Sequence, residues 1–222
     1  MQESNFIPFI YTKPSEDESL DRASRFFSDL DKRRSIRAFS TEPVSSEIIK
    51  KMIATASTAP SGAHKQPWTF CAITNSDLKS KIREAAEKEE YENYHGRMPK
   101  EWLDDLQQFE TDWKKPFLED APWLIVVMRQ NYGLDKQGNK EKYYYVQESV
   151  GIATGMLLAA IHQAGLVSLT HTPSPMNFLG EILERPENER AYLLIPVGYP
   201  AEDVGVPDLK RKTENEYLKI YK

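Results

Sequence analysis

Three arginines and a serine are crowded into the stretch RRSIR, in which Arg33, Arg34, Ser35 and Arg37 fall within five residues. A guanidinium binds a phosphate through parallel hydrogen bonds, and a serine hydroxyl can add one more. The segment follows an expected helix and precedes the strand-like AFS. It is therefore typical of a phosphate clamp, although a solvated basic loop has the same composition.

A second candidate lies downstream in the loop TAPSGAHKQPWTF, residues 58–70. Because Gly62 has no side chain, the backbone beside Pro60 and Ser61 can approach a flat ligand closely. The loop amides and the Ser61 hydroxyl can then hydrogen-bond the polar edge of a ring. An ordinary turn between a helix and a strand would use the same residues. Together, however, the two clusters fit a phosphorylated planar cofactor.

A third polar group lies between residues 88 and 115. Glu90 and Tyr94 are four residues apart, so they share one face of an expected helix, and Lys115 follows on the next segment. Taken alone, Glu90 reads as part of a solvated helix face and Lys115 as a surface charge. Only the combined pattern of motifs makes them candidates for a ligand site.

The elements that must position these groups alternate along the chain. Apolar periodicity and capping residues predict helices at residues 20–32, 45–56, 76–94, 101–115 and 143–164. Apolar runs predict strands at residues 68–74, 123–129, 166–171 and 192–197. Helices interleaved with a few strands predict an α+β sandwich. Because the last helix is apolar on most faces, it is expected to be buried in a core or between subunits.

The domain prediction is an extended arm at residues 1–19 and a single domain at residues 20–222. The segment from about residue 199 to the end has no partner of its own, so it is expected to wrap a neighbour such as another subunit. The N-terminus lacks a basic start followed by an apolar stretch, and no apolar run has the roughly 20 residues that span a bilayer. A cytoplasmic protein without membrane contact is expected.

Composition and missing motifs exclude several functions. The net charge of −5 argues against nucleic-acid binding, and the single cysteine, Cys71, allows no intrachain disulfide. There is no GxGxxG after a strand, no P-loop and no HExxH. The four histidines are scattered without the spacing of metal ligands, so no metal site is expected.

The ordered motifs RRSIRAFS, TAPSGAHKQPWTF, GLVSLTHTP and LLIPVGYP resemble the FMN-dependent nitroreductase superfamily. SGAH followed by PW, then EEYENY, WKK and VPDLKRK, is similar to its iodotyrosine deiodinase branch, over roughly residues 30–212. The resemblance implies a nitroreductase-like α-β-α sandwich with a central mixed, mostly antiparallel sheet. It also implies an intertwined homodimer with FMN sites at the interface.

The resemblance further implies which residues bind the flavin. The FMN phosphate and ribityl chain would be held by Arg33, Arg34, Ser35, Arg37 and Arg211. The isoalloxazine would be lined by Pro60, Ser61, Gly62, Thr170, His171 and Thr172, with the Thr172 hydroxyl near flavin N5. His171 stands where the vertebrate enzymes have threonine. It could alter the flavin potential or simply pack.

The implied reaction is the FMN-dependent reductive dehalogenation of halotyrosines, with Thr172 and Ala63 as its catalytic residues. The Ala63 amide would take the phenolate, which forms readily because an ortho halogen lowers the phenol pKa below about 10. In a lid at about residues 88–115, Glu90 would take the α-ammonium, and Tyr94 and Lys115 the α-carboxylate. NAD(P)H is the expected ultimate electron donor, and a separate flavin reductase is a candidate partner.

Two alternatives remain open on the sequence alone. One is a general NAD(P)H-dependent nitroreductase or quinone reductase with an open site on the same fold. The other is a protein without catalytic activity that binds flavin or halotyrosine. The ordered lid residues favour the dehalogenase over the first, whereas sequence cannot separate binding from turnover.

Overall fold

A computed structural model describes residues 6–222 and divides the chain into two compact units, residues 1–33 and 34–222. The first unit contains α1 (Glu16–Leu30), which begins earlier than residue 20 because the Ser15 side chain caps it by accepting from the Glu18 amide at 3.1 Å. Three acidic residues in its first turn also favour this start. Residues 1–5 of the predicted arm lie outside the described residues.

The second unit is built on a four-stranded sheet in the order β1-β2-β6-β5, and each pair of neighbouring strands is antiparallel. Its strands are β1 (Trp68–Ile73), β2 (Trp123–Gln130), β5 (Val167–Ser168) and β6 (Glu189–Gly198). A parallel bridge joins Ser35 to Ser168. The predicted α+β class with a mixed, mostly antiparallel sheet is therefore confirmed.

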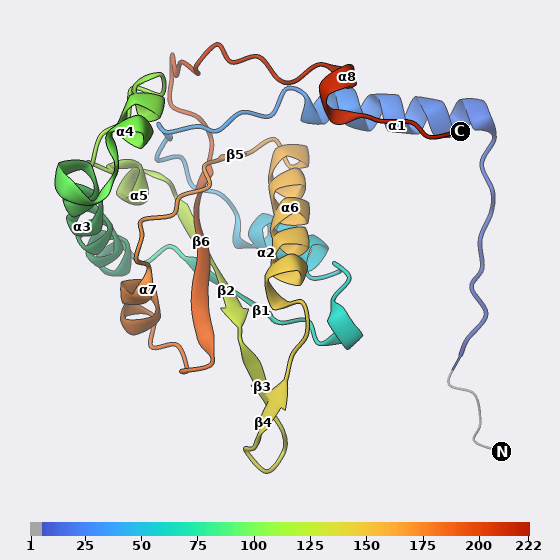
Figure 1. Ribbon diagram of the computed structural model, residues 1–222, viewed down its shortest axis with the longest axis horizontal. Helices are drawn as coiled ribbons and strands as arrows, with labels where there is room; N and C mark the ends of the chain where they lie inside the picture. The colour runs from blue at the N-terminus through green and yellow to red at the C-terminus, as the bar shows by residue number, and fades with distance from the viewer. Residues whose placement is uncertain (1–5) are drawn as a thin grey trace. The chain divides into compact units, whose positions relative to one another are not determined.

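Helices cover both faces of this sheet (Figure 1). The longer ones are α2 (Ser46–Ala56), α3 (Ser76–Glu92), α4 (Lys100–Gln107) and α6 (Val146–Gln163). The short ones are η1 (Gly62–His64), η2 (Asn93–Arg97), α5 (Phe117–Asp120), α7 (Asn177–Ile182) and α8 (Glu214–Tyr217). α2 and α6 pack on one face, and α3, α5 and α7 pack on the other.

The central strand β2 separates two hydrophobic cores because successive side chains of a strand point to opposite faces. Ile125 and Val127 join the core beneath α2 and α6, whereas Leu124 and Val126 join the core beneath α3 and α5. All four side chains are fully buried. The sheet thus forms the middle of an α-β-α sandwich, as predicted.

Several local predictions were wrong at their edges. The helix predicted at residues 101–115 ends at Gln107, and a short antiparallel hairpin of β3 (Tyr132–Leu134) and β4 (Lys140–Lys142) was not predicted. β5 is shorter than the strand predicted at residues 166–171, but His171 still pairs with Leu194 through a single bridge.

Candidate active site

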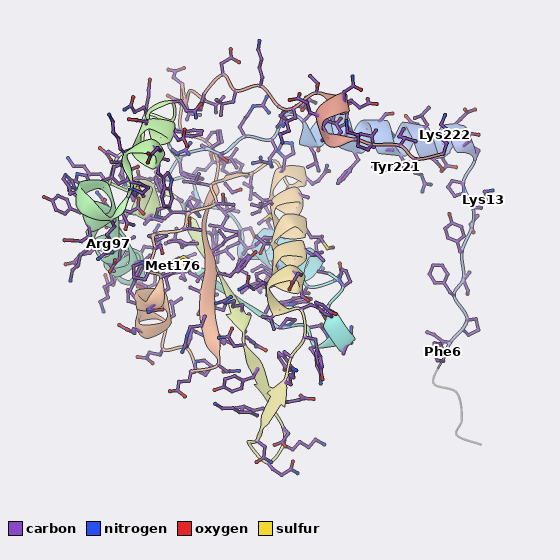
Figure 2. All side chains as sticks on the ribbon, viewed as in Figure 1. Phe6, Lys13, Arg97, Met176, Tyr221 and Lys222 are labelled. Atoms are coloured by element: carbon purple, nitrogen blue, oxygen red, sulfur yellow. The ribbon has the colours of Figure 1, made fainter. Side chains whose placement is uncertain are left out.

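A cleft of about 640 Å³ opens beside α3 and α4, and its volume is in the range of small-molecule sites. Figure 2 shows Arg97, one of its residues, beside these helices. The cleft is lined by Arg37, Glu90, Asn93, Tyr94, Arg97, Met98, Trp102, Leu106, Thr111, Lys115, Phe117, Leu169, Thr170, His171, Thr172, Ser174 and Pro175. Seven of the residues predicted from the sequence therefore meet in one cavity.

The Glu90 and Lys115 side chains form a buried ion pair in this cleft. The Lys115 Nζ lies 3.2 Å from the Glu90 Oε2 and also donates to the carbonyl oxygen of Asp112. Residue exposure is 7% for Glu90 and 3% for Lys115, so neither is the solvated surface charge that its local sequence suggested. Removing both charges from water is costly, and such a pair is often kept for a purpose other than stability.

Glu90 is buried because of its place on α3. The helix is capped by Asn75, whose side chain accepts from the Leu78 amide at 2.9 Å. Ile82 and Ala86 are fully buried, and Glu90 is the next residue at the same spacing of four. Glu90 thus continues the apolar positions of the helix in the sequence, and this pattern would have predicted that its carboxylate is buried.

Tyr94 lies on η2, directly after α3, and contacts the same ion pair. Its ring centroid is 5.3 Å from the Lys115 Nζ, and its hydroxyl donates to the Thr111 carbonyl at 3.4 Å. Burial raises the pKa of Tyr94 above its usual value of 10. The phenol therefore stays protonated at neutral pH and can donate a hydrogen bond to an anion.

His171 is another buried polar residue that lines the cleft. Its ring meets the Phe117 ring edge-on at 5.5 Å, and the Nε2 atom is buried without a hydrogen-bond partner. Burial, together with the nearby charges of Lys115 and Arg37, lowers the pKa of His171 to about 3. The imidazole is accordingly neutral at physiological pH.

Thr170 and Thr172 flank His171 in the sequence. Both threonines are exposed, whereas His171 is buried. This alternation follows from the extended backbone that pairs His171 with Leu194. Arg37 adds a cation to the cleft, with its guanidinium carbon 5.3 Å from the centroid of the Phe109 ring. The hydroxyls of Thr170 and Thr172 and the Arg37 guanidinium thus line the same cavity as Lys115.

The other predicted phosphate-binding residues lie outside the lining of this cleft. Arg34 is exposed, Ser35 forms its backbone bridge to Ser168, and Arg211 is exposed in the C-terminal segment. Arg33 is the last residue of the first unit. Their role in phosphate binding stays a prediction.

The loop with Pro60, Ser61, Gly62 and Ala63 also does not line the cleft. It packs near the start of α6, across the sheet from α3 (Figure 1), where the Gly62 amide donates to the Ser149 hydroxyl at 3.4 Å. A Cβ at Gly62 would lie 2.6 Å from the backbone oxygen of Tyr144. The close approach of the Tyr144 backbone therefore requires a glycine at this position, whereas the predicted contact of Gly62 with a flat ligand stays a prediction.

Sequence reasoning missed the apolar wall of the cleft. Met98, Trp102 and Leu106 line it at intervals of four residues, together with Phe117. Trp102 is 53% exposed, so the wall keeps a large apolar surface open. The sequence signal that could have predicted this wall is the apolar i, i+4 pair Trp102 and Leu106 on α4, a helix without buried residues.

Two kinds of function receive no support from the part of the chain that is described. Residues 6–222 contain no group of three or more histidine, cysteine, aspartate or glutamate side chains that could hold a metal ion. No helix in the same range has the length and hydropathy of a bilayer span.

Comparison with known proteins gives consistent matches. The profile of the nitroreductase family matches residues 30–199. The chain is 58% identical over 220 residues to an iodotyrosine deiodinase of Haliscomenobacter hydrossis, and the match covers 99% of each chain. It is 46% identical over 215 residues to the iodotyrosine deiodinase of Danio rerio, and that match covers 96% of this chain and 72% of the other. A crystal structure of oxidized iodotyrosine deiodinase bound to FMN and 3-iodo-L-tyrosine matches with a TM-score of 0.72 at 32% identity, covering 88% of this chain and 100% of that one.

Proposed function

Because this chain belongs to the iodotyrosine deiodinase branch of the nitroreductase family, we propose that it removes iodide reductively from iodotyrosine with FMN as its cofactor. The observation that carries the proposal for this chain is the buried Glu90–Lys115 pair in an aromatic cleft. An amino-acid zwitterion carries one charge of each sign, and this pair offers it one counter-charge for each. The proposal extends to other halotyrosines.

The residues of the cleft fit a bound flavin. Its walls combine apolar side chains with the exposed Thr170 and Thr172, the Arg37 cation and the partnerless Nε2 of His171. Such a mixture of apolar surface and a few polar groups is typical of cofactor sites. When bound, FMN supplies the electrons, while the protein provides binding and orientation. Arg34, Ser35, Arg37 and Arg211 are proposed to hold its phosphate and ribityl chain.

Binding of the substrate zwitterion is proposed to open the Glu90–Lys115 pair and give each charge a new partner. Glu90 accepts hydrogen bonds from the α-ammonium, and Lys115 donates to the α-carboxylate. Tyr94 can donate to the same carboxylate because its hydroxyl stays protonated. Since Glu90 and Lys115 are both buried, each of these contacts is stronger than it would be on the surface.

The chemical step replaces the halogen by hydrogen, so that halotyrosine, two electrons and one proton give tyrosine and halide. An amide donor at Ala63 would stabilise the phenolate, and the Thr172 hydroxyl would hydrogen-bond flavin N5. The apolar wall with Trp102 would cover the ring and exclude water, which aligns the reacting carbon.

The Ala63 amide can serve this reaction only if a second chain brings it to the cleft. We therefore propose an intertwined homodimer in which the Pro60–Ala63 loop of one subunit completes the site of its partner. Apolar side chains near that loop remain exposed in the single chain, with Tyr145 at 72% and Ile152 on α6 at 48%. A dimer would cover such surface.

The active protein is accordingly expected to have twice the mass of the 25.6 kDa chain. Native mass spectrometry and light scattering at the enzyme concentrations of the assay would measure this. Full activity in a particle of 25.6 kDa would contradict the dimer and the role of the Ala63 amide.

The proposed activity predicts that the purified FMN-bound protein binds 3-iodo-L-tyrosine and, with dithionite, releases one iodide for each tyrosine formed. Flavin fluorescence would follow binding, and iodide and tyrosine would be assayed directly. NADPH with and without an added flavin reductase would then test the proposed donor. Turnover of nitroaromatics without any response to halotyrosine would support a general nitroreductase instead. Binding without halide would support a protein that only binds these ligands.

A further inference from the structure

One face of α3 is joined to residues 115–121 by a row of polar contacts. At its start, the Lys79 Nζ donates to the Ala121 carbonyl at 2.7 Å. One turn later, the Arg83 Nη1 donates to the Glu119 carboxylate at 3.2 Å. The side chains at residues 79, 83 and 87 lie on one face of the helix because they are four residues apart. The row therefore runs along α3 toward the cleft.

Glu87 is the member of this row that reaches Lys115. Its Oε1 accepts the Lys115 backbone amide at 2.7 Å and the Arg83 Nε at 2.8 Å. Three residues further along α3, Glu90 pairs with the Lys115 ammonium. Helix α3 thus holds both the backbone and the side chain of the same lysine.

We propose that Glu87 is a positioning residue for the zwitterion site and acts through Lys115, an inference that rests on the proposed function. Glu87 does not line the cleft, so it is not expected to contact the substrate itself. Its side chain is only 19% exposed, and the Arg83 guanidinium keeps its carboxylate oriented. The contact fixes the point from which the long Lys115 side chain extends.

The physical reason is entropic. Lys115 lies just before α5, outside any helix, so its amide has no helical partner of its own. Without Glu87 the segment can move, and the ammonium must then be ordered again each time a carboxylate binds. If the Lys115 ammonium is already ordered in the free protein, the affinity for the carboxylate is higher. The fold of α3 does not depend on it, because Ile82 and Ala86 bury the helix independently.

The test compares two ligands on the FMN-bound protein: 3-iodo-L-tyrosine, and 2-iodophenol, which lacks the zwitterion. Glu87→Ala is expected to weaken binding of 3-iodo-L-tyrosine about tenfold or more, since a hydrogen bond to a charged group is lost. Binding of 2-iodophenol and FMN is expected to stay within about twofold, because neither uses Lys115. Glu87→Gln keeps an acceptor for the amide and should restore most of the affinity.

Glu84→Ala is the matched control because Glu84 is an exposed carboxylate on the same helix. Hydrogen exchange should also become faster at the Lys115 amide in Glu87→Ala and remain unchanged in Glu84→Ala. Equal losses for both ligands, or no loss for either, would overturn the positioning role while leaving the proposed function intact. A wild-type protein that binds 3-iodo-L-tyrosine no better than 2-iodophenol would overturn the proposed function and this inference together.

Discussion

Replacing Glu90 by glutamine is expected to weaken binding of 3-iodo-L-tyrosine by about 100-fold, because truncating one partner of a buried, hydrogen-bonded charge pair costs several kcal/mol. The glutamine would keep the shape of the side chain but offer the α-ammonium no counter-charge. The Lys115 ammonium would remain buried and would keep its contacts with the Asp112 carbonyl and the Tyr94 ring, but it would lose its counter-charge. The free site would then favour anions without an ammonium group.

Titration of the FMN-bound variant by flavin fluorescence measures this loss. Affinity for 3-(4-hydroxy-3-iodophenyl)propionate, which keeps the phenol and the carboxylate but lacks the ammonium, should fall much less than affinity for iodotyrosine. Glu92→Gln removes a carboxylate from an exposed position of the same helix and should leave both affinities unchanged. If Glu90→Gln bound iodotyrosine as tightly as the wild type, Glu90 would have no part in zwitterion capture.

The size of this effect follows from a feature that the sequence only partly revealed. The period of four that buries Ile82 and Ala86 extends to Glu90, so a closer reading of α3 could have placed its carboxylate inside. The burial of Lys115 could not be read in the same way. It depends on the contact of its segment with α3, which is a tertiary contact between elements separated in sequence.

The fold was more predictable than the site for a related reason. β1 and β2 were predicted within a residue because their apolar runs are continuous and bounded. The β3–β4 hairpin was missed because β4 reads KEK, which has no apolar alternation. The Pro60–Ala63 loop illustrates the limit for the site. Its residues suggested ligand contact, yet the loop lies outside the lining of the cleft in the single chain, and only the proposed homodimer would bring the two together.

Acid is expected to destabilise the FMN-free protein through His171. In the unfolded chain this imidazole protonates near pH 6.5, whereas in the folded protein its pKa is lowered to about 3 by burial and by the charges of Lys115 and Arg37. Between these two values the unfolded state binds the extra proton. The free energy of unfolding therefore falls as the pH falls, and the contribution of His171 is fully present only above about pH 6.5. From pH 7 to pH 5 the expected loss is about 2 kcal/mol.

Urea unfolding separates the contribution of His171 from those of other titrating groups. The wild type and His171→Gln are compared at several pH values between 7 and 5, at one fixed protein concentration. Glutamine keeps a polar group beside Phe117 but does not titrate, so the loss of stability on acidification should be smaller in the variant by about 2 kcal/mol.

Parallel pH profiles would mean that His171 takes up its proton while folded. Below about pH 6.5 a cationic imidazole would then stand near Lys115 and Arg37. With Arg97, the described lining of the cleft would hold four cations and a single carboxylate, Glu90. Such a site would favour an anion over a zwitterion. A neutral His171 is thus a condition for the selectivity proposed here, and the pH profile tests both.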